Sequence, residues 1–294
     1  MNRILIVGCG DIALRAARLL SQGGHCQLFG LVRDSARYPG LRSAGITPLL
    51  GDLDDAASLH RLSGLAHKVL HLAPPPNSGA CDTRTRNLLA ALARGTLPRR
   101  FIYVSTSGVY GDCGGARVSE TRPLNAQSAR AQRRVDAERQ IRTWARRNQV
   151  QAAILRVPGI YAAERLPLER LLAATPAIHS EEDSYTNHIH ADDLAHILLA
   201  ALRRARPNRV YHASDDSDLK MGDYFDAVAD AFGLVRPPRL PRTQVEHGVP
   251  PALWSFMNES RRLNNVRMKR ELEVVLRYPA VGYLLRELEQ RVKT

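Results

Sequence analysis

Short apolar runs alternate with amphipathic stretches along the first half of the chain. Residues 4–7 form an apolar run, and the following stretch places Ile12, Ala16 and Leu19 at helical spacing. The alternation continues with predicted strands at 27–32, 47–50, 68–72, 101–104 and 151–155 and predicted helices at 56–62, 85–93 and 125–148. Strands and helices that alternate in this way form βαβ units with right-handed crossovers. The sequence therefore predicts an α/β fold with a doubly wound parallel sheet, the Rossmann arrangement.

The second half of the chain is less regular. A helix over 191–204 and a strand over 209–211 repeat the earlier pattern, whereas residues 236–241 contain three prolines and predict no regular structure. We therefore predict discontinuous domains. The Rossmann domain comprises residues 1–157 and 187–213, and a smaller, mostly helical C-terminal lobe that binds the substrate comprises residues 158–186 and 214–294.

The composition indicates a globular chain with excess positive charge. The 294 residues carry a formal net charge of +13, but only four of the 42 basic residues are lysines, and the arginines are scattered. This distribution argues against a nucleic-acid surface and favours small anionic substrates such as nucleotides. No apolar run approaches the ~18 residues of a membrane span, and Gly8 ends the first run too early for a leader peptide. We therefore expect a cytoplasmic protein without a membrane partner.

A glycine-rich turn joins the first strand to the first helix, with the sequence Gly8-Cys9-Gly10-Asp11-Ile12-Ala13. The first glycine permits a tight turn, the second lets the backbone approach a pyrophosphate, and the small Ala13 lets helix and strand pack closely. The helix N-terminus offers free N–H groups and a partial positive charge to the phosphates. The predicted cofactor contacts in this turn are Gly8, Gly10, Asp11, Ile12 and Ala13.

The end of the second strand bears on the choice between NAD and NADP. Arg33 stands where a guanidinium can bind a 2′-phosphate and stack on adenine, and Arg37 can assist it. Asp34 favours NAD, because an acid at this point can accept from the ribose 2′-hydroxyl, unless it caps the next helix. Together these residues favour NADP over NAD. Asp52 can accept from the adenine amino group; alternatively, Asp52 or Asp54 caps a helix. His71 is expected to be a packed residue. Further predicted cofactor contacts are Asp52, Leu53, Leu72, Ala73 and Pro74.

Three further motifs occupy residues 103–111, 155–161 and 187–195. They read Tyr-Val-Ser-Thr-Ser-Gly-Val-Tyr-Gly, Leu-Arg-Val-Pro-Gly-Ile-Tyr and Asn-His-Ile-His-Ala-Asp-Asp-Leu-Ala. With the glycine turn, they resemble the extended short-chain dehydrogenase/reductase superfamily, in its NAD-dependent epimerase/dehydratase branch, nearly end to end. Residues 260–265 and 277–279 are similar to an atypical subgroup of that branch. The resemblance implies an NAD(P)-binding oxidoreductase that acts on a sugar nucleotide or a similar polar substrate.

The catalytic pattern of that family is incomplete in this chain. The resemblance gives Thr106 the task of binding the reacting oxygen of the substrate. The family's tyrosine acts as acid and base, and a lysine four residues later lowers its pKa and holds the nicotinamide ribose. Here Arg130 and Arg134 take those two positions, and no Tyr-x-x-x-Lys occurs anywhere in the sequence. A guanidinium transfers no proton at neutral pH. Arg134 can still hold the cofactor, and Tyr110 or Tyr161 is either a replacement acid or pocket lining.

The missing pair leaves two hypotheses for function. One is an oxidoreductase with an altered acid/base group, and the other is a non-catalytic NADP-binding sensor or regulatory protein. His188 and His190 alternate ahead of Asp192 and Asp193, as metal ligands do. The resemblance instead favours packed histidines and helix-capping acids, and the four cysteines lack CxxC spacing, so no metal is expected. The arginine-rich helix at 125–148 forms a dimer interface in many family members, which suggests a homodimer.

Overall fold

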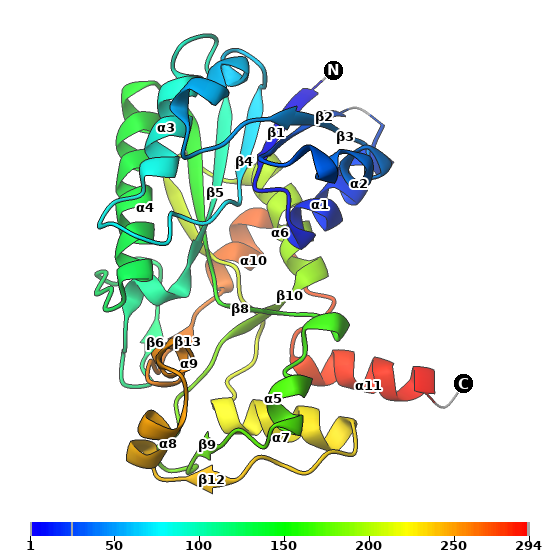
Figure 1. Cartoon of the computed structure of the whole chain (residues 1–294), viewed down its shortest axis with the longest axis vertical. Coiled ribbons are helices and arrows are strands. Elements are labelled where there is room, and N and C mark those ends of the chain that lie inside the picture. Colours follow the sequence, from blue (N-terminus) through cyan, green and yellow to red (C-terminus); the bar gives the residue numbers. More distant parts are fainter. Residues whose placement is uncertain (1, 25, 293–294) are drawn as a thin grey trace.

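The computed structural model describes residues 2–24 and 26–292 (Figure 1). Within these residues, seven parallel strands form the central sheet in the order β11-β7-β5-β4-β1-β2-β3. The strands are β1 (Asn2–Val7), β2 (Cys26–Val32), β3 (Ile46–Leu50), β4 (Lys68–His71), β5 (Arg100–Thr106), β7 (Gln151–Val157) and β11 (Arg209–His212). The strand order reverses between β1 and β4, which is the topological switch point of a Rossmann sheet. The predicted doubly wound fold is confirmed.

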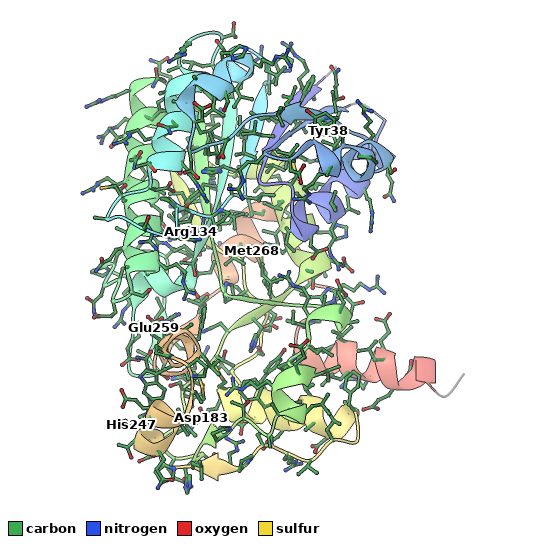
Figure 2. The ribbon with its side chains drawn as sticks, in the orientation of Figure 1. Tyr38, Arg134, Asp183, His247, Glu259 and Met268 are labelled. Carbon is green, nitrogen blue, oxygen red and sulfur yellow. The ribbon has the colours of Figure 1, made fainter. Side chains whose placement is uncertain are left out.

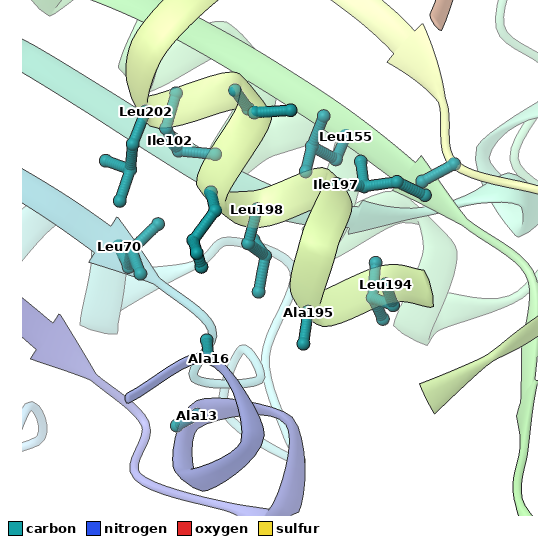
Figure 3. Packing of buried hydrophobic residues seen from close by; sticks show 14 of the residues in the cluster. Ala13, Ala16, Leu70, Ile102, Leu155, Leu194, Ala195, Ile197, Leu198 and Leu202 are labelled. Carbon is teal, nitrogen blue, oxygen red and sulfur yellow. The ribbon is translucent and has the colours of Figure 1, made fainter. Parts of the chain in front are cut away.

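Helices cover both faces of the sheet because side chains of a strand alternate between its faces. Ile4 and Ile6 of β1 join one buried cluster, and Leu5 and Val7 join the other. Figure 3 shows the first cluster, in which Leu70 of β4 lies among residues of α1 and α6. The first layer contains α1 (Asp11–Gln22), α2 (Tyr38–Ser43), α6 (Ala191–Arg204) and α10 (Val266–Leu272), and the second contains α3 (Thr83–Leu92), α4 (Ala129–Arg147) and the 3-10 helix η2 (Ala56–Leu62).

Shorter elements form the lower part of the molecule in Figure 1. Two further hydrophobic clusters lie there, one around Tyr161 and Tyr224 and one around Ile178 and Val245. The division into two lobes stays a proposal, which these clusters support except at α10 (Val266–Leu272), whose apolar side chains join the cluster of the sheet. None of the helices in the described ranges is both long and apolar enough to cross a membrane. The remaining elements are η1 (Ser35–Arg37), η3 (Ser107–Tyr110), β6 (Arg117–Val118), β8 (Gly159–Tyr161), η4 (Ala163–Arg165), α5 (Leu168–Leu172), β9 (Ala177–Ile178), β10 (His188–His190), α7 (Met221–Ala231), β12 (Arg239–Leu240), α8 (Arg242–Gly248), α9 (Pro251–Met257), β13 (Arg262–Leu263) and α11 (Val281–Val292).

Several segments bear on the sequence-based expectations. The strand predicted at 209–211 joins the sheet, because β11 pairs in parallel with β7. By contrast, α10 belongs to the predicted C-terminal lobe by sequence, yet Met268 and Leu272 are buried in the core of the sheet. Residues 56–62 form a 3-10 helix rather than an α-helix. Residues 236–241 are not wholly irregular, because the two-residue strand β12 pairs with β9 between the prolines.

A buried ion pair joins α4 to β7. Arg156 donates from Nε and Nη2 to the Glu138 carboxylate at 3.0 and 2.7 Å, and the two side chains are 3% and 2% exposed. Arg156 Nη1 also donates to the Tyr110 hydroxyl at 2.6 Å. That hydroxyl shares a hydrogen bond of 2.6 Å with His212 Nε2 of β11. One guanidinium thus holds together α4, β7, η3 and, through Tyr110, β11.

We expect Glu138→Ala to destabilise the fold by about 3–5 kcal/mol, because it leaves the Arg156 guanidinium buried without its carboxylate partner. Urea denaturation followed by circular dichroism measures the loss. Asp230→Ala is the matched control, since Asp230 forms a similar bidentate pair with Arg236 on the surface, where the side chains are 52% and 61% exposed. Equal midpoints for the two variants would contradict a structural role for the buried pair.

Candidate cofactor and substrate site

Two cavities lie at the carboxyl ends of the parallel strands, the edge at which α/β sheets bind ligands. The first, the cofactor cavity, has a volume of about 380 Å³ and lies beyond the ends of β1, β2, β3 and β4. The second, the Thr106 cavity, has a volume of about 210 Å³ and begins at the end of β5. The predicted cofactor residues that line the first cavity are Gly8, Gly10, Arg33, Asp52, Leu53, Leu72, Ala73 and Pro74.

The two glycines of the turn have different reasons to be glycine. Gly8 has a φ of +95°, and a Cβ on it would lie 2.4 Å from the backbone nitrogen of Ala73. Gly10 has an ordinary φ of −83° as the N-cap of α1, and a Cβ on it would meet no protein atom within 4 Å. The protein itself therefore does not require a glycine at position 10. The open space beside it fits the close approach of a pyrophosphate.

The remaining residues of the predicted turn do not line the cofactor cavity. Ala13 is fully buried in the core, as close packing of helix and strand requires. Asp11 is exposed and pairs with Arg15 at 2.9 Å. Asp11, Ile12 and Ala13 form the first turn of α1 and are absent from the cavity lining. Any contact of theirs with a cofactor would come from the backbone N–H groups of that turn, and it stays a prediction.

Charged side chains surround the end of β2. Arg33 lines the cofactor cavity and has no hydrogen-bond or ion-pair partner among the described residues. Arg37 Nη2 donates to the carbonyl oxygen of Cys9 at 2.6 Å and so braces the glycine turn. Arg84, which the sequence did not single out, also lines the cavity and holds Asp54 through two hydrogen bonds of 2.9 and 2.6 Å.

The two acids of this cavity stabilise turns. The Asp34 carboxylate accepts from the N–H of Ala36 at 2.8 Å and caps η1, the alternative weighed for it above. The Asp52 carboxylate accepts from the N–H of Asp54 at 3.0 Å. The cap of η2 is Asp55 rather than Asp52 or Asp54. The carboxylates of Asp34 and Asp52 each accept from a backbone N–H, whereas the Arg33 guanidinium has no acceptor among the described residues.

The Thr106 cavity combines a hydroxyl with charged and aromatic groups. Thr106 Oγ1 accepts from the N–H of Gly108 at 3.2 Å, which leaves the hydroxyl proton free to donate. The Arg130 guanidinium lies 4.1 Å from the centre of the Phe256 ring. Glu259 and Arg261 form an ion pair of 2.7 Å in the same cavity.

Several residues that line this cavity are not among the catalytic or cofactor-binding residues predicted from the sequence. Tyr185, Phe256 and Glu259 lie outside the motifs, and no sequence signal singles them out. His188 and Arg261 lie inside the quoted motifs 187–195 and 260–265, so a signal existed for them.

Arg134 lies on the side of α4 that faces β5 (Figure 2). Its Nη1 donates to the Val104 carbonyl oxygen at 2.8 Å and to the Tyr103 hydroxyl at 3.0 Å. Its charge is therefore held near the carboxyl end of β5, two residues before Thr106. Arg134 lines neither cavity, so its contact with the cofactor stays a prediction.

Tyr110 and Tyr161 do not face the cavity, which corrects the expectation that they do. Each is 1% exposed, and neither lines the Thr106 cavity. The Tyr110 hydroxyl is taken up by Arg156 and His212, and the Tyr161 hydroxyl donates to the Tyr278 carbonyl oxygen at 3.4 Å. Burial raises the pKa of Tyr110 to about 12 and raises that of Tyr161 further, so neither phenol is poised for proton transfer at neutral pH.

His71 and His190 are buried, whereas His188 lines the Thr106 cavity. His71 is fully buried against Thr85, and burial lowers its pKa to about 3, so the imidazole is neutral. The ring of His188 stacks on Tyr224 with 4.2 Å between ring centres, and that of His190 on Tyr278 with 3.8 Å. Among the described residues, no group of three or more His, Cys, Asp or Glu side chains is arranged to hold a metal.

The start of α6 differs from its prediction. His190 Nδ1 accepts from the N–H of Asp192 at 3.2 Å and caps the helix in place of an acid. Asp193 instead accepts from the backbone N–H groups of Arg277 and Tyr278 at 2.9 and 2.8 Å. The acid therefore secures the C-terminal segment against the sheet.

The fold is that of a dinucleotide-binding α/β protein, with a further cavity beyond β5. Residues 4–214 match the NAD dependent epimerase/dehydratase family. The chain therefore belongs to this NAD(P)-dependent family.

Individual proteins of known structure or sequence are also similar. A conserved protein of unknown function from Silicibacter pomeroyi DSS shares 28% identity and a TM-score of 0.81 over 100% of both chains. UDP-glucuronic acid 4-epimerase from Bacillus cereus, solved with UDP-glucuronic acid and NAD, has a TM-score of 0.76 at 18% identity over 99% of both chains. At that identity the likeness concerns the fold alone. dTDP-glucose 4,6-dehydratase from Mycobacterium tuberculosis is 25% identical over 215 residues, and the match covers 64% of each chain, less than two thirds of the dehydratase.

A buried carboxyl on Asp215, whose backbone N–H donates to the His188 carbonyl oxygen, makes stability depend on pH. Asp215 is 4% exposed, and burial raises its pKa from 3.8 to about 7. Because the folded pKa is the higher one, the stabilising contribution of the protonated form is complete below about pH 3.8 and is lost as the pH rises through about 7.

We therefore expect the free energy of unfolding of wild type to fall relative to that of Asp215→Asn between pH 5 and pH 8. The reason is that only wild type must ionise a buried carboxyl over that range. Denaturant midpoints across the pH range measure the difference. Asp230→Asn is the control, because the pKa of Asp230 is lowered by its hydrogen bond with Arg236, and its difference from wild type should stay flat. A flat profile for Asp215→Asn would refute the assignment.

Proposed function

We propose that this protein is an NADP-dependent oxidoreductase that acts on a sugar nucleotide or a similar polar, anionic substrate. The observation that carries the proposal is the composition of the Thr106 cavity, which combines a free hydroxyl donor with the Arg130 guanidinium at the ligand-binding edge of the sheet, whereas Arg261 is paired with Glu259. Sugar nucleotides carry phosphate groups, which arginine binds well. The similar Bacillus cereus epimerase and Mycobacterium tuberculosis dehydratase are named for such substrates.

The residues of the site divide the work. Thr106 donates its hydroxyl proton to the reacting oxygen of the substrate and so orients it. Arg130 binds an anionic group of the substrate, and the stacked Phe256 fixes the plane of its guanidinium. Arg134 stabilises negative charge from its position on α4, where its guanidinium lies beside the carboxyl end of β5. When bound, the nicotinamide supplies or accepts a hydride.

The burial of both candidate tyrosines favours a second candidate, a non-catalytic NADP-binding sensor or regulatory protein. Arg130 and Arg134 occupy the family's tyrosine and lysine positions, and the phenols of Tyr110 and Tyr161 are buried.

Hydride exchange separates the two candidates. Protein loaded with NADP⁺ is incubated with UDP-glucuronic acid and dTDP-glucose, and the absorbance of reduced nicotinamide is followed. Reduction that Thr106→Val abolishes supports the enzyme. Cofactor binding with no reduction by any sugar nucleotide supports the sensor.

For the cofactor, we expect NADPH to bind roughly tenfold or more tightly than NADH, because a charge-assisted contact to the 2′-phosphate contributes about 1.5–3 kcal/mol. Arg33→Ala should remove this preference by weakening NADPH and leaving NADH nearly unchanged. Fluorescence titration of the bound reduced nicotinamide measures both affinities. Arg18→Ala is the control, since Arg18 is exposed on α1, outside the cofactor cavity. Equal affinities in wild type, or a preference that survives Arg33→Ala, would reject the role of Arg33.

For the substrate, we expect Arg130→Ala to weaken binding of UDP-glucuronic acid by roughly tenfold, because a charged hydrogen bond is worth about 1.5 kcal/mol or more. Calorimetric titration of the NADPH-saturated protein measures this affinity. NADPH affinity should be unchanged, since Arg130 lies outside the cofactor cavity.

The double variant Arg130→Tyr with Arg134→Lys provides a second test of the same site. It restores the family's pair and should weaken anion binding in the same way. Unchanged affinity in both variants would place the substrate elsewhere.

A further inference from the structure

A third cavity lies beside the start of β11, the edge strand of the sheet, and has a volume of about 420 Å³. Its walls come from the start of β11, the segment before it and α10. None of its lining residues lines the cofactor cavity or the Thr106 cavity. Its charged lining residues, which define what we call the arginine cavity, are Arg206, Arg209, Arg267, Arg270, Glu120 and Glu271.

The two carboxylates of the arginine cavity are already occupied. Glu271 receives two hydrogen bonds from Arg209, at 3.1 and 2.5 Å, and a third from the Tyr211 hydroxyl at 3.0 Å. The hydrogen bond from Arg209 is the main reason that the pKa of Glu271 is lowered, so this acid is ionised at neutral pH. Glu120 is buried and lies 3.5 Å from Arg267.

These contacts fix two of the four guanidiniums as rigid walls. Arg209 is held by both oxygens of Glu271, and Arg267 is held by Glu120 and by the Val210 carbonyl oxygen, to which it donates at 3.0 Å. Because their positions are set before any ligand arrives, little side-chain entropy is lost when a ligand binds between them.

The other two guanidiniums have spare donors. Arg270 has no hydrogen-bond or ion-pair partner among the described residues, and Arg206 reaches Glu271 only at 3.8 Å, with a side chain that is 68% exposed. Asn264 also lines the cavity, and its Oδ1 is taken by the N–H of Val266. Four positive groups therefore face two engaged negative ones, and the excess charge lies at Arg206 and Arg270.

We propose that the arginine cavity is a second binding site, for the phosphate or diphosphate group of a small molecule. Guanidinium groups match phosphate oxygens in pairs, and several converging arginines suit a polyvalent anion better than a single carboxylate. The site is separate from the cofactor and substrate cavities, so it does not depend on the proposed function.

Calorimetric titration with inorganic pyrophosphate tests the site, with wild type compared to the double variant Arg206→Ala and Arg270→Ala. We expect the variant to bind pyrophosphate at least roughly tenfold more weakly in one component of the isotherm, because it loses charged hydrogen bonds. Arg61→Ala, on η2 outside the three cavities, controls for the loss of a surface charge and should bind as wild type does. NADPH affinity, measured on the same proteins, should be unchanged in all of them.

Three results would overturn the proposal. The first is an identical isotherm for wild type and the double variant, and the second is equal weakening by Arg61→Ala. The third concerns a neighbouring cavity of about 550 Å³, which is lined by Arg122, Arg142 and Arg146. If a short single-stranded oligonucleotide bound much more tightly than pyrophosphate, and Arg142→Ala with Arg146→Ala removed that binding, the arginines would serve a nucleic-acid surface instead.

Discussion

The buried pair of Arg156 and Glu138 is the constraint on which the arrangement of the site depends. A charge in the protein interior is tolerated only when its partner and its remaining hydrogen bonds are in place. Arg156 satisfies this condition with two bonds to Glu138, one to the Tyr110 hydroxyl and one of 3.3 Å to the Glu120 carbonyl oxygen. These partners lie on separate segments, so each segment has one low-energy position relative to β7. The turn after Thr106 and the helix that carries Arg130 are positioned together as a result.

This network also explains why the Tyr110 hydroxyl does not face the Thr106 cavity. Tyr110 lies four residues after Thr106 in the motif 103–111, but its hydroxyl completes the hydrogen bonds of a buried guanidinium and of His212. Turning it toward the cavity would leave both groups unsatisfied, at a cost of about 1–3 kcal/mol or more for each buried group. Tyr110 therefore secures the loop that carries Thr106, which is a structural contribution to the site.

The sequence predicted the parts of the structure that follow from local periodicity and from backbone geometry. The sheet was predictable because its strands are apolar on both faces, and the cofactor cavity because Gly8 permits a contact with Ala73 that no side chain allows. Side-chain direction was not predictable, because the partners of Tyr110 lie far along the chain. The cap of α6 was assigned to acids by residue type, yet the backbone brings His190 to that position. Phe256 lies in no motif, and only the tertiary fold brings it next to Arg130.

Arginine takes different tasks in this protein according to its partners. Glu138 pairs with Arg156, and Glu271 pairs with Arg209. In such pairs the carboxylate neutralises the guanidinium, which then stabilises the fold. Arg33 and Arg130 each line a cavity without such a partner among the described residues, so their charge is available to a ligand. A guanidinium keeps its proton at any physiological pH, and it therefore binds anions but does not exchange protons with them. We propose that Arg130 and Arg134 stand where the family has its tyrosine and lysine, so that the site gains a second positive charge and has no proton donor at these two positions. On this proposal, a substrate that carries its own anionic group suits the site.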